Sequence, residues 1–210
     1  MDGVILDSDD FTASGWIVEA FMKTLRDFGI PETEENGRAL YIVNLLQNGE
    51  AFCQRHGIPS LETLWNRREQ NYFSGKLAAL EDGRITLFPD VSSLDRLTAD
   101  YRLGIASNSP QPIVDRVVDR FGLDRLFSVW IGRGSSFSDL RHAKPAPDLL
   151  ERMKTALGSR SGYYIGDQPE DAQAARAASL TPILLSRNGS SGDLHDLTEL
   201  AAYLDRTGAD

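Results

Sequence analysis

Apolar and polar residues follow a helical spacing through the first part of the chain. Between residues 12 and 82, apolar side chains recur every three or four positions, which is typical of amphipathic helices. The spacing predicts a helix over residues 14–28 that ends at Gly29 and Pro31, one or two helices over 40–55, and another over 60–80. Because this part has no convincing strand pattern, we predict a helical block over residues 12–82.

After this block, short apolar runs alternate with amphipathic segments. The pattern predicts strands over residues 103–106, 128–131, 163–165 and 182–185, and helices over 113–121, 148–157, 171–179 and 194–204. Strands separated by helices indicate crossover connections and a parallel sheet. The apolar run at residues 4–6 is the only strand candidate before the helical block. We therefore predict an α/β fold whose sheet domain is interrupted by a helical insertion.

Composition indicates the cellular compartment and argues against some classes of binding partner. The 210 residues suit one ordinary domain with a small insertion, and the net charge of −9 argues against a nucleic-acid or anionic-membrane partner. Cys53 is the only cysteine, no apolar run approaches the roughly 20 residues that span a bilayer, and no secretory signal is visible, so we expect a cytoplasmic protein. Its 4 lysines against 18 arginines suit either a salt-rich cytoplasm or a GC-rich genome.

Polar residues follow two of the predicted strands directly. Ser107 and Asn108 come after the strand at 103–106, and Asp167 comes after the strand at 163–165. Ligands of parallel sheets gather at the carboxyl ends of the strands, so we expect these groups to meet there. Carboxylates would hold Mg²⁺, whereas Ser107, Asn108 and Lys144 would bind phosphoryl oxygens. Taken singly, each has an ordinary alternative: a turn, an exposed lysine or, for Asp171, a helix cap.

Four segments together carry a resemblance to a known family. They are residues 2–8 (DGVILDS), 104–108 (GIASN), 144–148 (KPAPD) and 165–171 (IGDQPED). In this order and spacing they resemble the haloacid dehalogenase superfamily, in the subgroup with a helical cap inserted after the first motif. The resemblance implies a Rossmann-like parallel-sheet core at 1–11 and 83–210 and a helical cap at 12–82. It also implies that Ser107 and Lys144 bind phosphate, while Asp167 and Asp171 hold or orient magnesium.

The first motif fits the family pattern in two registers. The pattern is an apolar strand, then Asp-x-Asp-Gly, usually Thr or Val, an apolar pair and often Asp-Ser. One register makes Asp7 the nucleophile and Asp9 the acid/base, but it puts Asp10 where glycine is expected. The other makes Asp2 the general acid/base, with its backbone carbonyl toward the metal, and fits at every position that it reaches. We favour the second, which places the nucleophilic aspartate and its strand immediately before Met1 and implies a truncated chain. In this register residues 4–6 are less a strand than the exit into the cap.

The resemblance implies a function as well as a fold. We expect a Mg²⁺-dependent phosphatase that hydrolyses a small phosphorylated metabolite, such as phosphoglycolate or a sugar phosphate, through a phospho-aspartate. A phosphoglucomutase-type phosphoryl transfer would use the same residues. From another class, the chain could be a catalytically inactive binding module or a fragment. The sequence carries no signal for the substrate's identity or the oligomeric state.

Overall fold

The chain forms two compact units. The computed structural model describes residues 1–8, 15–189 and 191–207. One unit contains Met1–Asp7, Thr86–Arg133 and Lys144–Asp210, and the other contains Ser8–Ile85 and Gly134–Ala143. The second unit thus has wider bounds than the helical block expected at 12–82, since it includes a second stretch near the middle of the chain. We call them the sheet unit and the helical unit.

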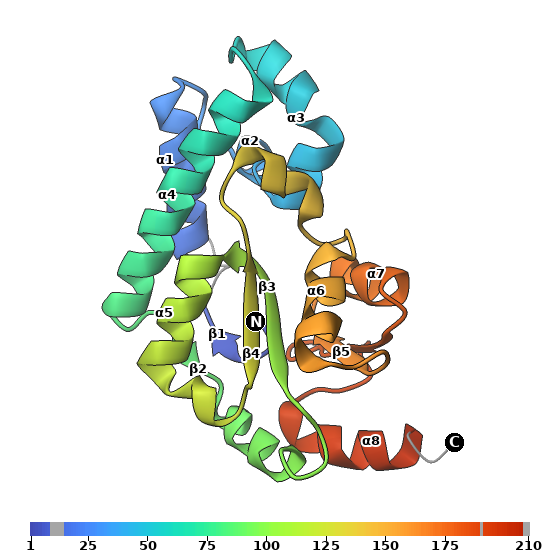
Figure 1. The fold of residues 1–210 in the computed structure, drawn as a ribbon. Coiled ribbons are helices and arrows are strands. Elements are labelled where there is room, and N and C mark those ends of the chain that lie inside the picture. The colour runs from blue at the N-terminus through green and yellow to red at the C-terminus, as the bar shows by residue number, and fades with distance from the viewer. Residues whose placement is uncertain (9–14, 190, 208–210) are drawn as a thin grey trace. The chain divides into compact units, whose positions relative to one another are not determined.

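Two pairs of parallel strands form the centre of the sheet unit. β3 (Gly104–Pro110) pairs with β4 (Val129–Arg133), and β5 (Tyr163–Gly166) pairs with β6 (Thr181–Leu184). The helices α5 (Gln111–Phe121) and α6 (Asp148–Leu157) pack against the first pair and flank it in Figure 1. Parallel strands joined through helices confirm the predicted α/β fold.

The apolar residues of these elements meet in one core cluster. α7 (Pro169–Ala177) packs against β5 and β6, and its small residues Ala174 and Ala175 are fully buried. They contact a cluster that also contains Ala106 of β3, Ile131 of β4 and Met153 of α6. Because alanine side chains are small, α7 approaches the sheet closely, and this places its first turn at the carboxyl end of β5.

The amino-terminal residues form a turn and a short ribbon. Val4 and Ile5, expected as part of a strand, lie in a turn in which the Met1 carbonyl accepts bonds from the backbone N–H groups of residues 4 to 6. The chain then forms β1 (Leu6–Asp7), which pairs antiparallel with β2 (Thr86–Leu87). Within the described chain, β1 thus pairs with β2 and belongs to neither of the two parallel pairs.

The remaining elements of the sheet unit are mostly short and helical. They are η1 (Pro89–Leu97), η2 (Leu123–Arg125), η4 (Leu197–Glu199) and α8 (Leu200–Thr207). The single helix expected over 194–204 is thus a 3₁₀ turn followed by an α-helix that begins at Leu200. None of the helices in the described ranges is long and apolar enough to cross a membrane.

The regular elements in the described part of the helical unit are all helices. They are α1 (Trp16–Asp27), α2 (Glu34–Arg38), α3 (Ile42–His56), α4 (Leu61–Glu81) and η3 (Phe137–His142). Thr33 and Ser60 cap α2 and α4 with their side-chain oxygens, and α3 ends at Gly57 in the left-handed conformation. The helices α1 and α4 pack closely along their lengths, which gives this unit its own core.

Candidate active site

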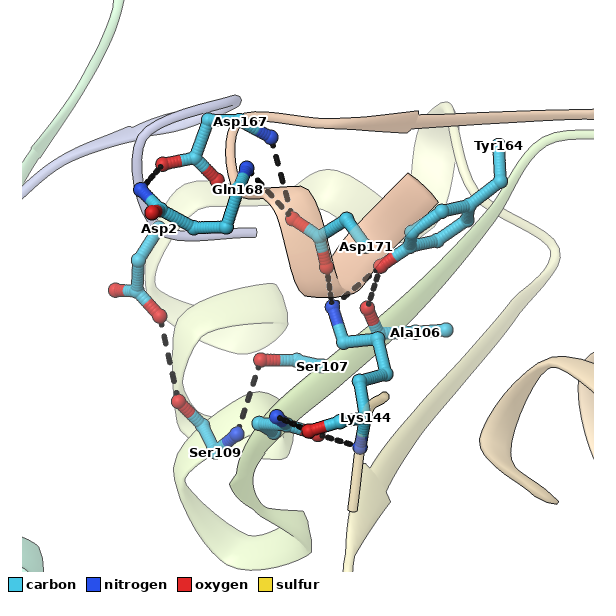
Figure 2. A network of polar contacts seen from close by, with 10 residues as sticks. Asp2, Ala106, Ser107, Ser109, Lys144, Tyr164, Asp167, Gln168 and Asp171 are labelled. Carbon is cyan, nitrogen blue, oxygen red and sulfur yellow. Dashed lines mark hydrogen bonds and ion pairs between the residues drawn. The ribbon is translucent and has the colours of Figure 1, made fainter. Parts of the chain in front are cut away.

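A buried ion pair lies at the centre of the polar network shown in Figure 2. Lys144 Nζ donates to Asp171 Oδ1 over 2.5 Å and to the Tyr164 hydroxyl over 2.6 Å. The Tyr164 hydroxyl in turn donates to the carbonyl of Ala106 on β3, at 3.0 Å. Lys144 and Asp171 are 5% and 7% exposed. The network therefore connects the carboxyl end of β3 with the first turn of α7.

Burial and pairing shift the pKa values of these groups in opposite directions. Burial alone lowers the pKa of Lys144, but its contacts with Tyr164 and Asp171 outweigh that cost and raise it above the ordinary value. Burial would raise the pKa of Asp171, but the Lys144 ammonium holds it below its usual range. Burial raises the pKa of Tyr164 to about 12. At neutral pH the network is thus an ammonium, a carboxylate and a neutral phenol.

Asn108 holds the backbone of Lys144. Its side-chain oxygen accepts a bond from the Lys144 N–H at 2.8 Å, and its amide nitrogen donates to the Lys144 carbonyl at 3.1 Å. Both polar ends of the Asn108 side chain are therefore used on one neighbouring residue. This contact explains how a residue between two helical elements is fixed at the end of β3, and the phosphate contact expected of Asn108 stays a prediction.

Ser107 and Asp2 lie at the same edge of the sheet. Ser107 is 3% exposed, and its hydroxyl oxygen accepts a bond from the Ser109 N–H at 3.1 Å. The Ser109 hydroxyl donates to Asp2 Oδ2 at 3.3 Å. In Figure 2, dashed lines join Ser109 to both Asp2 and Ser107. Ser109, which the motif comparison does not single out, thus orients the Asp2 carboxylate relative to Ser107.

Asp167 and Asp171 are held together by the start of α7. The Oδ2 atom of Asp171 accepts bonds from the backbone N–H groups of Asp167 and Gln168, both at 3.2 Å. Asp171 is therefore the third residue of a capping box and not the N-cap itself, which is Gln168. Asp167 accepts a bond from the Gln168 side chain at 2.7 Å, and burial raises its pKa.

Two glycines allow these close approaches. A Cβ atom on Gly166 would lie 2.2 Å from the Cβ of Asp171, and one on Gly3 would lie 2.3 Å from Asp167 Oδ2. Gly3 also has a φ of +70°, in the left-handed region that favours glycine. The backbone of Gly3 therefore lies directly beside the Asp167 carboxylate, which brings the amino-terminal turn to the end of β5.

The α-amino group of Met1 is buried in the same place. Burial lowers its pKa, and so does the nearby Lys144 ammonium, while the carboxylates of Asp2, Asp171 and Asp167 oppose both effects. Burial and the Lys144 charge outweigh the three carboxylates, so the net effect lowers the pKa of the Met1 amino group.

Arg187 fixes the turn that carries Asp2. Its guanidinium donates to the carbonyls of Gly3 at 3.2 Å and Val4 at 2.6 Å, and it forms two bonds with Asp90 at 2.9 and 3.1 Å. It also lies over the Phe88 ring, 3.6 Å from the centroid. No motif in the sequence indicated this role, because the partners are a backbone turn and a carboxylate about a hundred positions away.

The structure brings together six of the residues predicted for the site, and Asp7 of the alternative register is not among them. Hydrogen bonds or close approaches link the following residues into one network: Asp2, Ser107, Asn108, Lys144, Asp167 and Asp171. Asp7 is exposed on β1, where it pairs with Thr86. Asp9 lies outside the described residues. The network therefore contains the Asp2 of the favoured register.

The oxygen donors of this network suit magnesium, which prefers oxygen ligands. Asp2 and Asp167 present carboxylates, and burial disfavours the charged form of Asp167, which a nearby cation would stabilise. Asp171 instead carries an ion pair with Lys144. Within the described ranges, no three carboxylate, histidine or cysteine side chains converge into a metal-binding group. The Asp167 carboxylate thus has the chemistry to hold the ion, together with the backbone carbonyl of Asp2 that the favoured register directs toward it, and Asp171 orients Lys144.

The chain is an α/β protein whose polar groups cluster at the carboxyl ends of its parallel strands, which is where proteins of this class bind their ligands. The family model described as haloacid dehalogenase-like hydrolase matches residues 1–179, and the chain belongs to this family. A phosphoglycolate phosphatase of Escherichia coli (strain K12) is 32% identical over 117 residues, which are 54% of this chain and 45% of that protein. The corresponding protein of Salmonella typhimurium is 32% identical over 123 residues, 57% of this chain and 47% of its own length. The chain thus matches about half the length of these curated relatives.

Solved structures share the fold along nearly the whole chain. One described as a haloacid dehalogenase-like hydrolase, from Bacteroides fragilis, has a TM-score of 0.68 at 22% identity and covers 95% of this chain and 96% of its own. A predicted phosphoglycolate phosphatase from Haemophilus somnus 129PT has a TM-score of 0.65 at 22% identity, with coverages of 96% and 94%. The expected family and fold class are therefore confirmed.

Proposed function

We propose that this protein is a Mg²⁺-dependent phosphatase that acts on a small phosphorylated metabolite. One observation carries the proposal: the buried Lys144 ammonium, the Ser107 hydroxyl and the Asp2 and Asp167 carboxylates belong to one polar network at the carboxyl ends of β3 and β5. A phosphate dianion needs cationic and hydroxyl donors, and the carboxylates beside it need a cation. A phosphate and a magnesium ion together satisfy both requirements.

Each residue has a defined task in this proposal. Ser107 and Lys144 bind the phosphoryl oxygens and offset the charge that develops during transfer. Asp2 is the general acid/base, which protonates the leaving oxygen and later activates water. Asp167 and the Asp2 carbonyl are the groups that would hold Mg²⁺, and Asp171 orients Lys144. A bound magnesium ion would supply charge neutralisation at the phosphate.

The proposed reaction passes through a phospho-aspartate. Its nucleophile is an aspartate directly ahead of Met1, as the favoured register of the first motif implies. We also propose that residues 12–82 act as the cap that selects the substrate.

The proposed substrate class is inferred from the names of the proteins to which the chain is similar. The curated relatives that match are phosphoglycolate phosphatases, and a protein described as a β-phosphoglucomutase from Thermotoga maritima shares the fold with a TM-score of 0.59. We therefore favour phosphoglycolate or a sugar phosphate as substrate, with hydrolysis ahead of phosphoglucomutase-type transfer. An inactive binding module is the candidate from another class.

Release of phosphate from p-nitrophenyl phosphate, with and without Mg²⁺, tests the proposal. The assay compares the printed chain with a form extended by an apolar segment that ends in aspartate. We expect Mg²⁺-dependent hydrolysis in the extended form, and its loss on Asp2→Asn, whereas Asp7→Asn retains it. An extended form that binds phosphate without hydrolysing any ester tested would support the binding module. Full activity of the printed chain that Asp7→Asn abolishes would contradict the Asp2 register.

A further inference from the structure

The peptide group between Asp2 and Gly3 has a fixed direction. Its N–H donates to the carbonyl of Leu6 at 3.0 Å. The group is planar and trans, since within the described chain only the bond between Lys144 and Pro145 is cis. The Asp2 carbonyl therefore points away from the Leu6 carbonyl, and it cannot turn unless the bond from Gly3 to Leu6 breaks. Whatever holds this turn thus also sets the direction of the Asp2 carbonyl.

The turn ends where a longer helix would continue. The Met1 carbonyl accepts the N–H groups of residues 4–6, so the segment resembles a single turn of helix. In a longer helix, the carbonyls of Gly3 and Val4 would accept the N–H groups of the residues four positions further on. Here the chain enters β1 instead, and Val4 is buried. Buried carbonyls require partners, so this end of the turn needs donors from elsewhere in the chain.

Arg187 supplies both donors. Its Nε donates to the Gly3 carbonyl at 3.2 Å, and its Nη2 donates to the Val4 carbonyl at 2.6 Å. Cationic side chains interact favourably with the last carbonyls of a helix, which carry partial negative charge. Arg187 follows β6 and lies 184 positions from Gly3. The guanidinium thus caps the turn as a side chain at a helix end does, although it comes from a distant part of the sequence.

The guanidinium is itself held in place. It forms two bonds with the Asp90 carboxylate, at 2.9 and 3.1 Å, and lies 3.6 Å from the centroid of the Phe88 ring. Asp90 Oδ2 also accepts the N–H of Leu197 at 2.8 Å. The side chains of Arg187 and Asp90 are 15% and 11% exposed. Because a paired bond to a carboxylate fixes the plane of a guanidinium, the donors that face the turn are oriented by the protein itself.

We infer that Arg187 is a positioning residue for the metal site. It acts through the turn: Arg187 holds the carbonyls of Gly3 and Val4, the turn holds the Gly3 N–H, and this N–H shares a peptide plane with the Asp2 carbonyl. The consequence for Mg²⁺ rests on the proposed function, in which that carbonyl and the Asp167 carboxylate hold the ion. Removing a group that orients a metal ligand typically lowers metal affinity by about 10- to 100-fold.

Two measurements on the printed chain and its variants test the inference. Hydrogen exchange of the amides of residues 3–6 reports on the turn, and water-proton relaxation by Mn²⁺, a probe for Mg²⁺, reports on metal affinity. We expect Arg187→Ala to speed exchange at least about tenfold and to weaken Mn²⁺ binding about tenfold or more. Arg187→Lys should restore only part of both, because an ammonium lacks the forked donors that reach Asp90 and the two carbonyls together.

Leu123→Ala is the control for lost stability. Leu123 is fully buried in η2, which packs against α5, so its truncation leaves a cavity beside that helix. We expect it to lower the midpoint of urea unfolding at least as much as Arg187→Ala, while exchange in the turn and Mn²⁺ affinity stay unchanged. If Leu123→Ala alters both as much as Arg187→Ala does, the effect belongs to general stability and the inference is overturned.

The outcomes separate this role from the proposed function. Faster exchange together with weaker Mn²⁺ binding in Arg187→Ala supports the positioning role. Unchanged exchange overturns it, and so does faster exchange with unchanged Mn²⁺ affinity. If the printed chain binds no Mn²⁺, the metal site of the proposed function is contradicted, and amide exchange alone then decides whether Arg187 fixes the direction of the Asp2 carbonyl.

Discussion

Lys144 and Asp171 form a buried ion pair, with Nζ and Oδ1 2.5 Å apart and side chains that are 7% and 9% exposed. A candidate phosphate ligand and a carboxylate of the fourth motif thus neutralise each other. The pair keeps the ammonium charged in a buried site and holds it between Asp171 of α7 and Tyr164 of β5. In the proposed function, a substrate phosphate would therefore meet a cation that is already positioned.

Removing one member of this pair is expected to destabilise the fold strongly. Lys144→Met leaves Asp171 as an uncompensated buried carboxylate, which costs about 3–5 kcal/mol in the free energy of unfolding. Urea denaturation measures the change. Arg38→Ala, which breaks an exposed pair with Glu34, is the control and is expected to cost less than about 1 kcal/mol. Since Lys144→Met/Asp171→Asn removes the residual charge, it should be more stable than Lys144→Met, and a less stable double variant would contradict this account.

Gly3→Ala is expected to cost more than Gly29→Ala. Both glycines have a positive φ, +70° and +67°, so both substitutions carry the conformational penalty of about 1–2 kcal/mol. A Cβ on Gly29 meets nothing within 4 Å, whereas one on Gly3 meets Asp167 at 2.3 Å. The extra cost of Gly3→Ala in urea denaturation therefore measures the contact with Asp167. Equal costs would show that this contact relaxes freely.

Arg187→Ala is expected to destabilise the protein by about 1–3 kcal/mol, because it removes the partly buried charged partner of Asp90 and frees the carbonyls of Gly3 and Val4. Arg187→Lys should recover only part of this, since an ammonium cannot form the paired bonds of a guanidinium. Urea unfolding is the measurement. Arg84→Ala, in an exposed pair with Asp82, serves as control. Full rescue by lysine would argue against the bidentate contact.

Cys53 is expected to react slowly and to make stability fall at alkaline pH. It is 2% exposed in α3, and burial raises the pKa of its thiol. Because the folded-state pKa is the higher one, this contribution to stability is fully present below the ordinary pKa of about 8.5 and is lost as the pH rises through the folded-state value. Thiol labelling at pH 8 should be at least about tenfold slower than that of free cysteine.

Cys53→Ala is the control for the alkaline effect. Urea midpoints at pH 7 and pH 10 should fall further in the natural chain than in this variant, since only the natural chain has a thiol to titrate at position 53. The chain has one cysteine, so the labelling signal reports on this residue alone. An equal fall in both proteins would assign the alkaline loss to other groups.

Local patterns predicted the strands and helices well where apolar spacing was regular. The helices α1, α5 and α6 and the strand β5 fall where the sequence placed them, within a few residues. The short ribbon of β1 and β2 was missed, because two-residue strands have no periodicity to detect. By pattern alone the apolar residues of the turn at residues 3–5 resemble a strand, whereas the favoured register of the first motif makes residues 4–6 an exit into the cap; the conformation of this turn is set by the carbonyl of Met1.

Motifs predicted which polar residues of the site meet, but not what holds them. Order along the chain and strand ends were enough to bring Ser107, Lys144 and Asp167 together. The supports Tyr164 and Arg187 act through a partner distant in sequence, which a single sequence does not reveal. In α4 the pattern suggested an apolar face, yet Arg68 is also buried there, with its guanidinium over the rings of Phe21 and Tyr72.

The ribbon of β1 and β2 has an evolutionary consequence. Asp7 and Thr86 are direct register partners, so the chain leaves the sheet unit and returns to it at adjacent positions. A tight hairpin turn could join these two residues without shifting either strand. Insertions of different length and sequence can therefore be exchanged between the same two points while the strands of the sheet unit keep their places.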